Sequence, residues 1–372
     1  MQNEKRKLFL LLWSLIAVPL LCLAQEPSLS GQDDREVMAG ESTEGASAPV
    51  LETVVVTGTL PGPSLWRVSN GENELYILGS HSPLPARMKW DSLEVEEILA
   101  SAQEVLAPSG AEARLSASAV FKISLLARSA NAATKIPARQ TLEDLVPPST
   151  FEAWEVLRAK YLPSDRGVDR KRPIFASQEL YYSAISASGM TRENVVWSRI
   201  ADMADKRGIA IRETKIEFPL DIDRKKYKAG IAAITESRVD ETTCFAETVS
   251  SLEADLELMR KGANAWATGD LYLIRTLSLV DPQPACKKAY DLLMGFQRRP
   301  ELGVLADDAW IAAARASLSK NGTTFAVLPL QKLMGPSSMV ERLRSAGYQV
   351  EAPDDGSDLG GVGSAFQRSG DN

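Results

Sequence analysis

Residues 75–85 read Leu-Tyr-Ile-Leu-Gly-Ser-His-Ser-Pro-Leu-Pro, and this stretch decides how the rest of the chain is interpreted. Its first four residues form a short apolar run that stops at Gly79. A run of this length, bounded by a turn residue, is typical of a buried β-strand. The polar residues Ser80, His81 and Ser82 therefore follow the end of a predicted strand.

Strand and helix patterns alternate outward from this segment. Further strands are predicted at residues 104–107, 209–213 and 324–328, and helices at 91–103, 113–128, 148–160, 175–187, 192–207 and 338–346. Asp91 is predicted to cap the first helix, because residues 91–94 have the capping-box pattern. Alternation of this kind favours an α/β sheet with crossover helices.

The middle of the chain follows a different pattern, that of one long amphipathic helix ended by Gly269. Its apolar residues recur every three or four positions: Phe245, Val249, Leu252, Leu256, Met259, Ala263 and Trp266. We interpret this stripe as a face that packs on neighbouring helices. A lid or a partner-binding face is the alternative, with Glu253 and Arg260 on the solvent side of the helix.

The two ends of the chain predict export and separate the folded part from its flanks. A cationic start, an apolar run and Cys22-Leu23-Ala24 predict a signal peptide over residues 1–24, so we expect a periplasmic protein of a Gram-negative cell. Residues 25–62 and 354–372 are rich in small and polar residues and are predicted to be a disordered linker and tail. The folded domain is predicted over residues 63–353.

Charge and cysteine content limit the partners and the cellular compartment that we expect for the protein. The net charge of −7 argues against nucleic acid and anionic membranes as partners, and no apolar run outside the signal peptide is long enough to span a bilayer. Cys244 and Cys286 remain after cleavage of the signal peptide, and an even pair in an oxidising compartment predicts a disulfide. Two buried free thiols are the alternative.

Four segments together resemble one protein family. They are residues 65–68 (Leu-Trp-Arg-Val), 75–85, 324–336 (Thr-Phe-Ala-Val-Leu-Pro-Leu-Gln-Lys-Leu-Met-Gly-Pro) and 347–350 (Gly-Tyr-Gln-Val). In these frames the chain resembles the TraB/GumN family, which is similar to the Tiki-type metalloproteases. The resemblance implies a mixed β-sheet with crossover helices, strand ends that converge on one pocket, and a helical insertion.

The resemblance also implies a divalent metal held by two Gly-x-x-His motifs and strand-end carboxylates, but the histidines are missing. The first His position is occupied by Ser82 and the second by Lys332, while His81 stands one place too early. One step along a strand reverses the side-chain direction, so we expect His81 to be a turn residue at the pocket rim. The strand predicted at 104–107 ends in Ala107-Pro108-Ser109-Gly110, without a carboxylate at this end, and the family's Arg-Asn pair falls at Ala306-Asp307.

The predicted pocket therefore contains Gly79, Ser80, His81, Ser82, Glu213 and Lys332. Glu213 is the acid that the resemblance retains. Ser82 and Lys332 are candidates for a catalytic Ser-Lys dyad, in which a desolvated lysine is the base. The alternative is a solvated Lys332, or one paired with Glu213. No metal and no other cofactor is expected.

These residues predict an exported protein that lacks the family's metal site and has a binding or regulatory role toward an envelope protein or peptide. Two alternatives remain open. One is a hydrolase that uses Ser82 and Lys332 or an unrecognised metal site. The other is a structural partner in the envelope that presents the long helix.

Overall fold

The computed structural model describes residues 62–353, with gaps at 138–139, 166, 221–222, 224, 226–227, 231, 233–235, 237–239, 279–283, 295–298 and 336. The predicted signal peptide, almost all of the predicted linker, and the predicted tail lie outside the described residues. The amide of Gly62 donates a hydrogen bond of 3.1 Å to the carbonyl of Ala267, so the described chain begins fixed to the fold.

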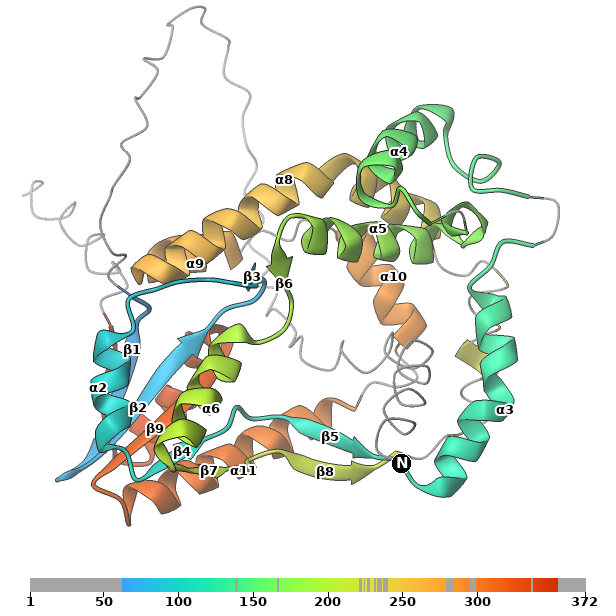
Figure 1. Cartoon of the computed structure of the whole chain (residues 1–372). Helices are drawn as coiled ribbons and strands as arrows, with labels where there is room; N and C mark the ends of the chain where they lie inside the picture. Colours follow the sequence, from blue (N-terminus) through green and yellow to red (C-terminus); the bar gives the residue numbers. More distant parts are fainter. Residues whose placement is uncertain are drawn as a thin grey trace, which may run out of the picture.

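The centre of the fold is a 6-stranded mixed sheet with the order β10-β1-β2-β9-β4-β7 (Figure 1). The strands are β1 (Leu65–Asn70), β2 (Asn73–Ser80), β4 (Glu104–Leu106), β7 (Ala210–Arg212), β9 (Thr323–Pro329) and β10 (Gln349–Glu351). β1 is antiparallel to β2 and β10, whereas β2, β9, β4 and β7 run parallel. The predicted α/β class and its mixed sheet are confirmed.

The last parallel strand is inserted between the first two. β9 pairs with β2 on one side and with β4 on the other, and Phe325–Leu328 are fully buried. A strand covered on both faces has a continuous apolar run, which is the pattern that predicted it from the sequence. The segment that follows β9 therefore lies at the middle of the sheet's carboxyl edge.

Helices cover the sheet and share its core, which includes Leu99, Ile200, Trp310 and Leu343. They are α2 (Leu93–Ser101), α6 (Val195–Arg207), α9 (Leu271–Ser278), α11 (Pro300–Leu318), α12 (Leu330–Leu333) and α13 (Met339–Ser345). The predicted capping box is wrong in detail: the N-cap of α2 is Ser92, and the Asp91 carboxylate instead accepts from the Leu93 amide at 3.0 Å. Aspartate makes such short-range turns with the backbone in competition with a helix cap.

A second, helical core lies beside the sheet. It contains Trp154, Leu180, Phe245 and Leu256. The elements of this region are α4 (Pro148–Tyr161), the short 3-10 helix η2 (Val168–Arg170), α5 (Pro173–Ala187), α8 (Glu241–Thr268) and α10 (Pro284–Met294). Helix α3 (Ala117–Ala133) precedes them in the chain and lies on the flank of the molecule (Figure 1). Two small sheets complete the fold, formed by β3 (Leu84–Pro85) with β6 (Met190–Thr191) and by β5 (Ala111–Arg114) with β8 (Ile216–Pro219).

The long helix α8 runs from α4 and α5 toward α9 (Figure 1), and its side chains take part in both cores. Residues from Phe245 to Leu256 lie in the helical core, whereas Ala263 and Trp266 lie in the sheet core. The apolar stripe predicted from the sequence is thus a packing face. Glu253 is half exposed, and its carboxylate accepts hydrogen bonds from Lys160 and Tyr161 of α4.

The two cysteines join α8 to α10. The sulfur atoms of Cys244 and Cys286 lie 2.08 Å apart, at the bonding distance of a disulfide, and both residues are buried. Ile174 and Ala289 pack around them in a small cluster. The predicted pairing therefore agrees with the geometry.

No helix in the described part of the chain is long and apolar enough to cross a membrane.

Candidate functional site

The carboxyl ends of the parallel strands meet at one edge of the main sheet. Ser80 of β2 is the register partner of Pro329 in β9, and Leu106 of β4 is the partner of Ala326 in β9 and of Arg212 in β7. The ends of these strands and the segments that leave them contain all of the predicted pocket residues. The edge is therefore the candidate site.

Gly79 holds this edge together by allowing close packing. A Cβ atom at this position would lie 2.2 Å from Cδ2 of Leu330, closer than real Cβ atoms come to other atoms, and 3.0 Å from the ring of Trp66, which is a tight contact. The indole nitrogen of Trp266 donates a hydrogen bond of 2.7 Å to the Gly79 carbonyl. Gly79 thus brings the end of β2 against both α12 and α8.

The two serines of the motif point toward the connection between β6 and α6. Oγ of the buried Ser80 accepts from Nδ2 of Asn194 at 3.3 Å, and Asn194 also caps α6 through a 3.0 Å bond from the Trp197 amide. Oγ of the exposed Ser82 donates to the carbonyl of Arg192 at 3.1 Å. Both hydroxyls therefore fix the end of β2 to a neighbouring segment.

His81 lies between these serines in sequence and packs against α8. A Cβ atom added at Gly262 of α8 would lie only 2.9 Å from Nε2 of His81, so the ring packs closely against this glycine. Burial lowers the pKa of His81 and so favours the neutral imidazole at neutral pH. Its Nδ1 has no hydrogen-bond partner among the described residues. His81 is half-buried where its ring meets α8 at Gly262, and its role as a turn residue at the pocket rim stays a prediction.

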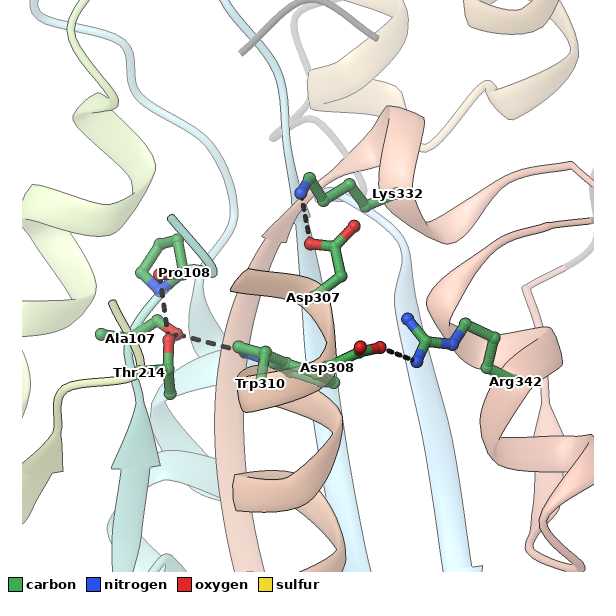
Figure 2. A network of polar contacts seen from close by, with 8 residues as sticks. All are labelled: Ala107, Pro108, Thr214, Asp307, Asp308, Trp310, Lys332 and Arg342. Atoms are coloured by element: carbon green, nitrogen blue, oxygen red, sulfur yellow. Dashed lines mark hydrogen bonds and ion pairs between the residues drawn. The ribbon is translucent and has the colours of Figure 1, made fainter. Parts of the chain in front are cut away.

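Lys332 is engaged in an ion pair at the centre of the edge. Its ammonium contacts the carboxylate of Asp307, which comes from α11 (Figure 2). Only 21% of the Lys332 side chain and 16% of the Asp307 side chain are exposed. The predicted alternatives were a solvated Lys332 or a pair with Glu213. Neither is found, because Lys332 is mostly covered and is paired with Asp307.

Side-chain donors bind the backbone carbonyls that follow β4 and so connect the ends of β4 and β7. Oγ1 of Thr214 donates to the carbonyls of Ala107 and Pro108 at 2.9 and 3.1 Å, and the indole of Trp310 donates to Ala107 at 3.1 Å (Figure 2). Glu213, the residue before Thr214, is exposed. The retained acid of the resemblance therefore lies outside this buried network.

Asp307 and Asn194 are the residues at this edge that the sequence did not assign to a role. A helix that precedes a parallel strand runs back along it, so the first turns of α11 lie near the carboxyl end of β9. That rule would have brought Asp307 near Lys332. Asn194 had the signal of an N-cap residue ahead of an apolar helix.

These side chains do not fit the metal that the resemblance implies. A catalytic metal needs about three protein ligands and an open position. Lys332 presents an ammonium, Asp307 is paired with it, and the Ser82 hydroxyl donates to a carbonyl. Across the described ranges, no group of three or more His, Cys, Asp or Glu side chains is placed to hold a metal ion.

The fold is α/β, with a mixed sheet, a helical region beside it, and a carboxyl edge held together by an ion pair and hydrogen bonds. The model of the TraB/PrgY/gumN family matches residues 64–352, which is most of the chain. The chain therefore belongs to the TraB/PrgY/gumN family. No curated protein and no solved structure matches it.

Proposed function

We propose that this family member is exported and acts by binding, in a regulatory role toward an envelope protein or peptide, without metal-dependent hydrolysis. The observation that carries the proposal is the Lys332–Asp307 ion pair at the carboxyl edge of the sheet. In the family that the chain resembles, a metal-binding histidine stands at the position of Lys332. An ammonium at that position repels a divalent cation and also neutralises the nearest carboxylate.

Partial burial strengthens this argument. Both partners are mostly covered, so each charge depends on the other for compensation. A metal could enter only if the pair separated and left the ammonium without its partner. The parts of the pair that stay exposed, 21% of the Lys332 side chain and 16% of the Asp307 side chain, leave polar atoms with which a polar part of a peptide can form hydrogen bonds.

A hydrolase that uses Ser82 and Lys332 is the competing proposal, and the contacts give it less support. A nucleophile and its base must lie within hydrogen-bond reach of one another. The Ser82 hydroxyl is bonded to the Arg192 carbonyl, and the Lys332 ammonium is bonded to Asp307. A partner-binding role for the apolar face of α8 has no support, because that face lies within the two cores.

The export part of the proposal rests on residues 1–24 and on the cysteine pair. The cationic start and apolar run have the pattern of a signal peptide. Cysteines at bonding distance suit an oxidising compartment such as the periplasm. Fractionation of cells that express the full chain would test this: a cleaved form in the periplasmic fraction is expected, and an uncleaved cytoplasmic form would contradict export.

The first test of the binding proposal is the metal content of the chain from residue 25 onward, measured by mass spectrometry. Its melting temperature would be recorded with and without Mn²⁺, Co²⁺ or Zn²⁺. We expect no stoichiometric metal and no stabilisation. One bound metal per chain together with a rise in melting temperature would overturn the proposal.

A second test separates binding from hydrolysis. Cleavage of a denatured protein substrate would be measured with the wild type and with Lys332→Ala, and with Arg342→Ala as the control at the neighbouring ion pair with Asp308. We expect no cleavage by any of the three proteins. Cleavage by the wild type and by Arg342→Ala that is lost in Lys332→Ala would establish the hydrolase instead.

A further inference from the structure

Helix α3 and Leu115, two residues before its start, expose large apolar side chains to solvent. The exposed fractions are 41% for Leu115, 38% for Val120, 64% for Phe121 and 55% for Leu125. Single exposed apolar residues are common, but several on one short segment mark an interaction surface. We call these four residues together with Arg128 the α3 surface.

The helical spacing places the most exposed residues on one face. Phe121, Leu125 and Arg128 are separated by four and three residues, so they form a stripe along the helix. The buried residues Ala119, Leu126 and Ala133 recur every seven residues and define the opposite face. Helix α3 thus has one apolar face that packs inward and a second that faces solvent.

The charged side chains within α3 itself have one sign. The charged residues of α3 are Lys122 and Arg128, and the sequence between Ala113 and Leu142 contains no aspartate or glutamate. The whole chain has a net charge of −7. An apolar and cationic segment in an acidic protein is complementary to an anionic surface that also has an apolar layer.

The position of α3 leaves this surface accessible. Figure 1 shows α3 on the flank of the molecule, beyond the ribbon of β5 and β8 and away from the main sheet. The helix spans Ala117–Ala133, 17 residues, which is shorter than the roughly 20 residues that a spanning helix needs. The helix is too short to span a bilayer, and its exposed Phe121 and Leu125 beside Arg128 suit a helix that lies in the membrane–water interface.

We propose that the α3 surface docks the protein on an anionic phospholipid membrane. Phe121 and Leu125 enter the boundary between headgroups and acyl chains, and Arg128 meets the lipid phosphates. This attachment is separate from the carboxyl edge of the sheet. It concentrates the protein at a membrane surface without a spanning segment, whereas the net charge of the whole chain argues against anionic membranes.

The experiment is flotation of the chain from residue 25 onward with lipid vesicles, so that the apolar run of residues 1–24 does not contribute. Vesicles of phosphatidylcholine alone would be compared with vesicles that also contain phosphatidylglycerol. We expect binding to the anionic vesicles, weakened by high salt because screening reduces the attraction of Arg128 to phosphate. Absence of binding to the anionic vesicles would overturn the proposal.

Variants identify the surface that binds. Phe121→Ser with Leu125→Ser should lower binding at least about tenfold, because both side chains lose their burial in lipid. Arg128→Glu should weaken binding to anionic vesicles only. The matched control is Val304→Ser with Leu305→Ser, which changes two exposed apolar residues of α11 and should leave binding unchanged.

Two further measurements keep the result interpretable. Circular dichroism should show the same helix content and melting temperature for the α3 variants, since the changed residues are exposed. Light scattering would report the oligomeric state. A wild type that self-associates, becomes monomeric in Phe121→Ser with Leu125→Ser, and ignores vesicles would show that a second copy covers the surface and would overturn the membrane proposal.

Discussion

The two cores that α8 joins are closed in different ways. The sheet core is closed by close packing and backbone hydrogen bonds at its carboxyl edge, with Gly79 and the Trp266 indole in contact. The helical core has, beside its own apolar packing, a small adjoining cluster in which Cys244 and Cys286 join α8 to α10. The family motif around Gly79 therefore has a structural role, because it holds the end of β2 against its neighbours. The helical region is held instead by α8 and by the Cys244–Cys286 cross-link.

The largest effect is expected where the helix enters the sheet core. Trp266→Ala removes a fully buried side chain and the hydrogen bond to Gly79, and should lower the free energy of unfolding by about 3–5 kcal/mol. Urea denaturation followed by circular dichroism would measure it, with the exposed Tyr272→Ser as the control. One cooperative transition is expected, because α8 belongs to both cores. Two separate transitions would show that the cores are independent.

Removal of the cross-link should be nearly as costly. Replacing Cys244 and Cys286 by alanine opens a loop with a sequence separation of 42 residues, which predicts a loss of about 4 kcal/mol from loop entropy. Melting curves with and without a reducing agent would test this. The reductant should destabilise the wild type and leave the double variant unchanged. A wild type that is insensitive to reductant would indicate free thiols.

A smaller effect is expected from one added methyl group at the end of β2. Gly79→Ala brings a Cβ atom against Leu330 and Trp66, and this overpacking should cost about 1–3 kcal/mol. Gly110→Ala is the matched control, since the nearest atom to its Cβ would be Lys215 Cγ at an ordinary 3.6 Å. Equal stability of the two variants would contradict the close packing of this edge.

The ion pair at the carboxyl edge should contribute less than the packing. Lys332→Ala leaves the mostly covered Asp307 carboxylate without its partner and should cost about 1–2 kcal/mol. Arg342→Ala breaks the exposed pair with Asp308 and should cost about 0–1 kcal/mol. Chemical denaturation of both variants gives the difference. A larger loss in Arg342→Ala would show that burial does not set the strength of these pairs.

The smallest effect is a pH dependence that belongs to His81. Its pKa is lowered by burial in the folded state, so the unfolded chain binds the proton more readily. Stability should be fully present above the ordinary histidine pKa of about 6.5 and should fall as the pH drops below it. His81 is the single histidine of the chain, so His81→Gln should flatten the profile of urea midpoints between pH 8 and 5. An unchanged profile would assign the effect to carboxylates.

The sequence predicted the elements well where one local pattern decides them. The strand at 324–328 appears as β9 because an apolar run suits a strand buried on both faces. The stripe from Phe245 to Trp266 appears as α8 because its period matches a helix. The cap of α2 was predicted one residue early, since an aspartate near a helix start has two local ways to bond the backbone.

The site was harder to predict, because its contacts join segments far apart in the chain. Lys332 and Asp307 are 25 residues apart in the chain, with β9 between them, and Ser80 and Asn194 are 114 residues apart. Spacing within a motif contains no information on such partners. The α3 surface was missed for another reason: net charge averages over the whole chain and conceals a segment without acids.

The shared helix also decides which pieces of this protein can be made separately. A fragment that ends before Glu241 would contain β1, β2, β4 and β7 of the main sheet but would lack β9 and β10. It would also lack α8, which contributes Trp266 to the sheet core and Phe245 to the helical core. A fragment restricted to α8 and the residues after it would contain β9 without its neighbours β2 and β4. Neither half has a complete interior, so split-protein and domain-truncation designs should keep α8 intact and cut in the segments that flank the described fold.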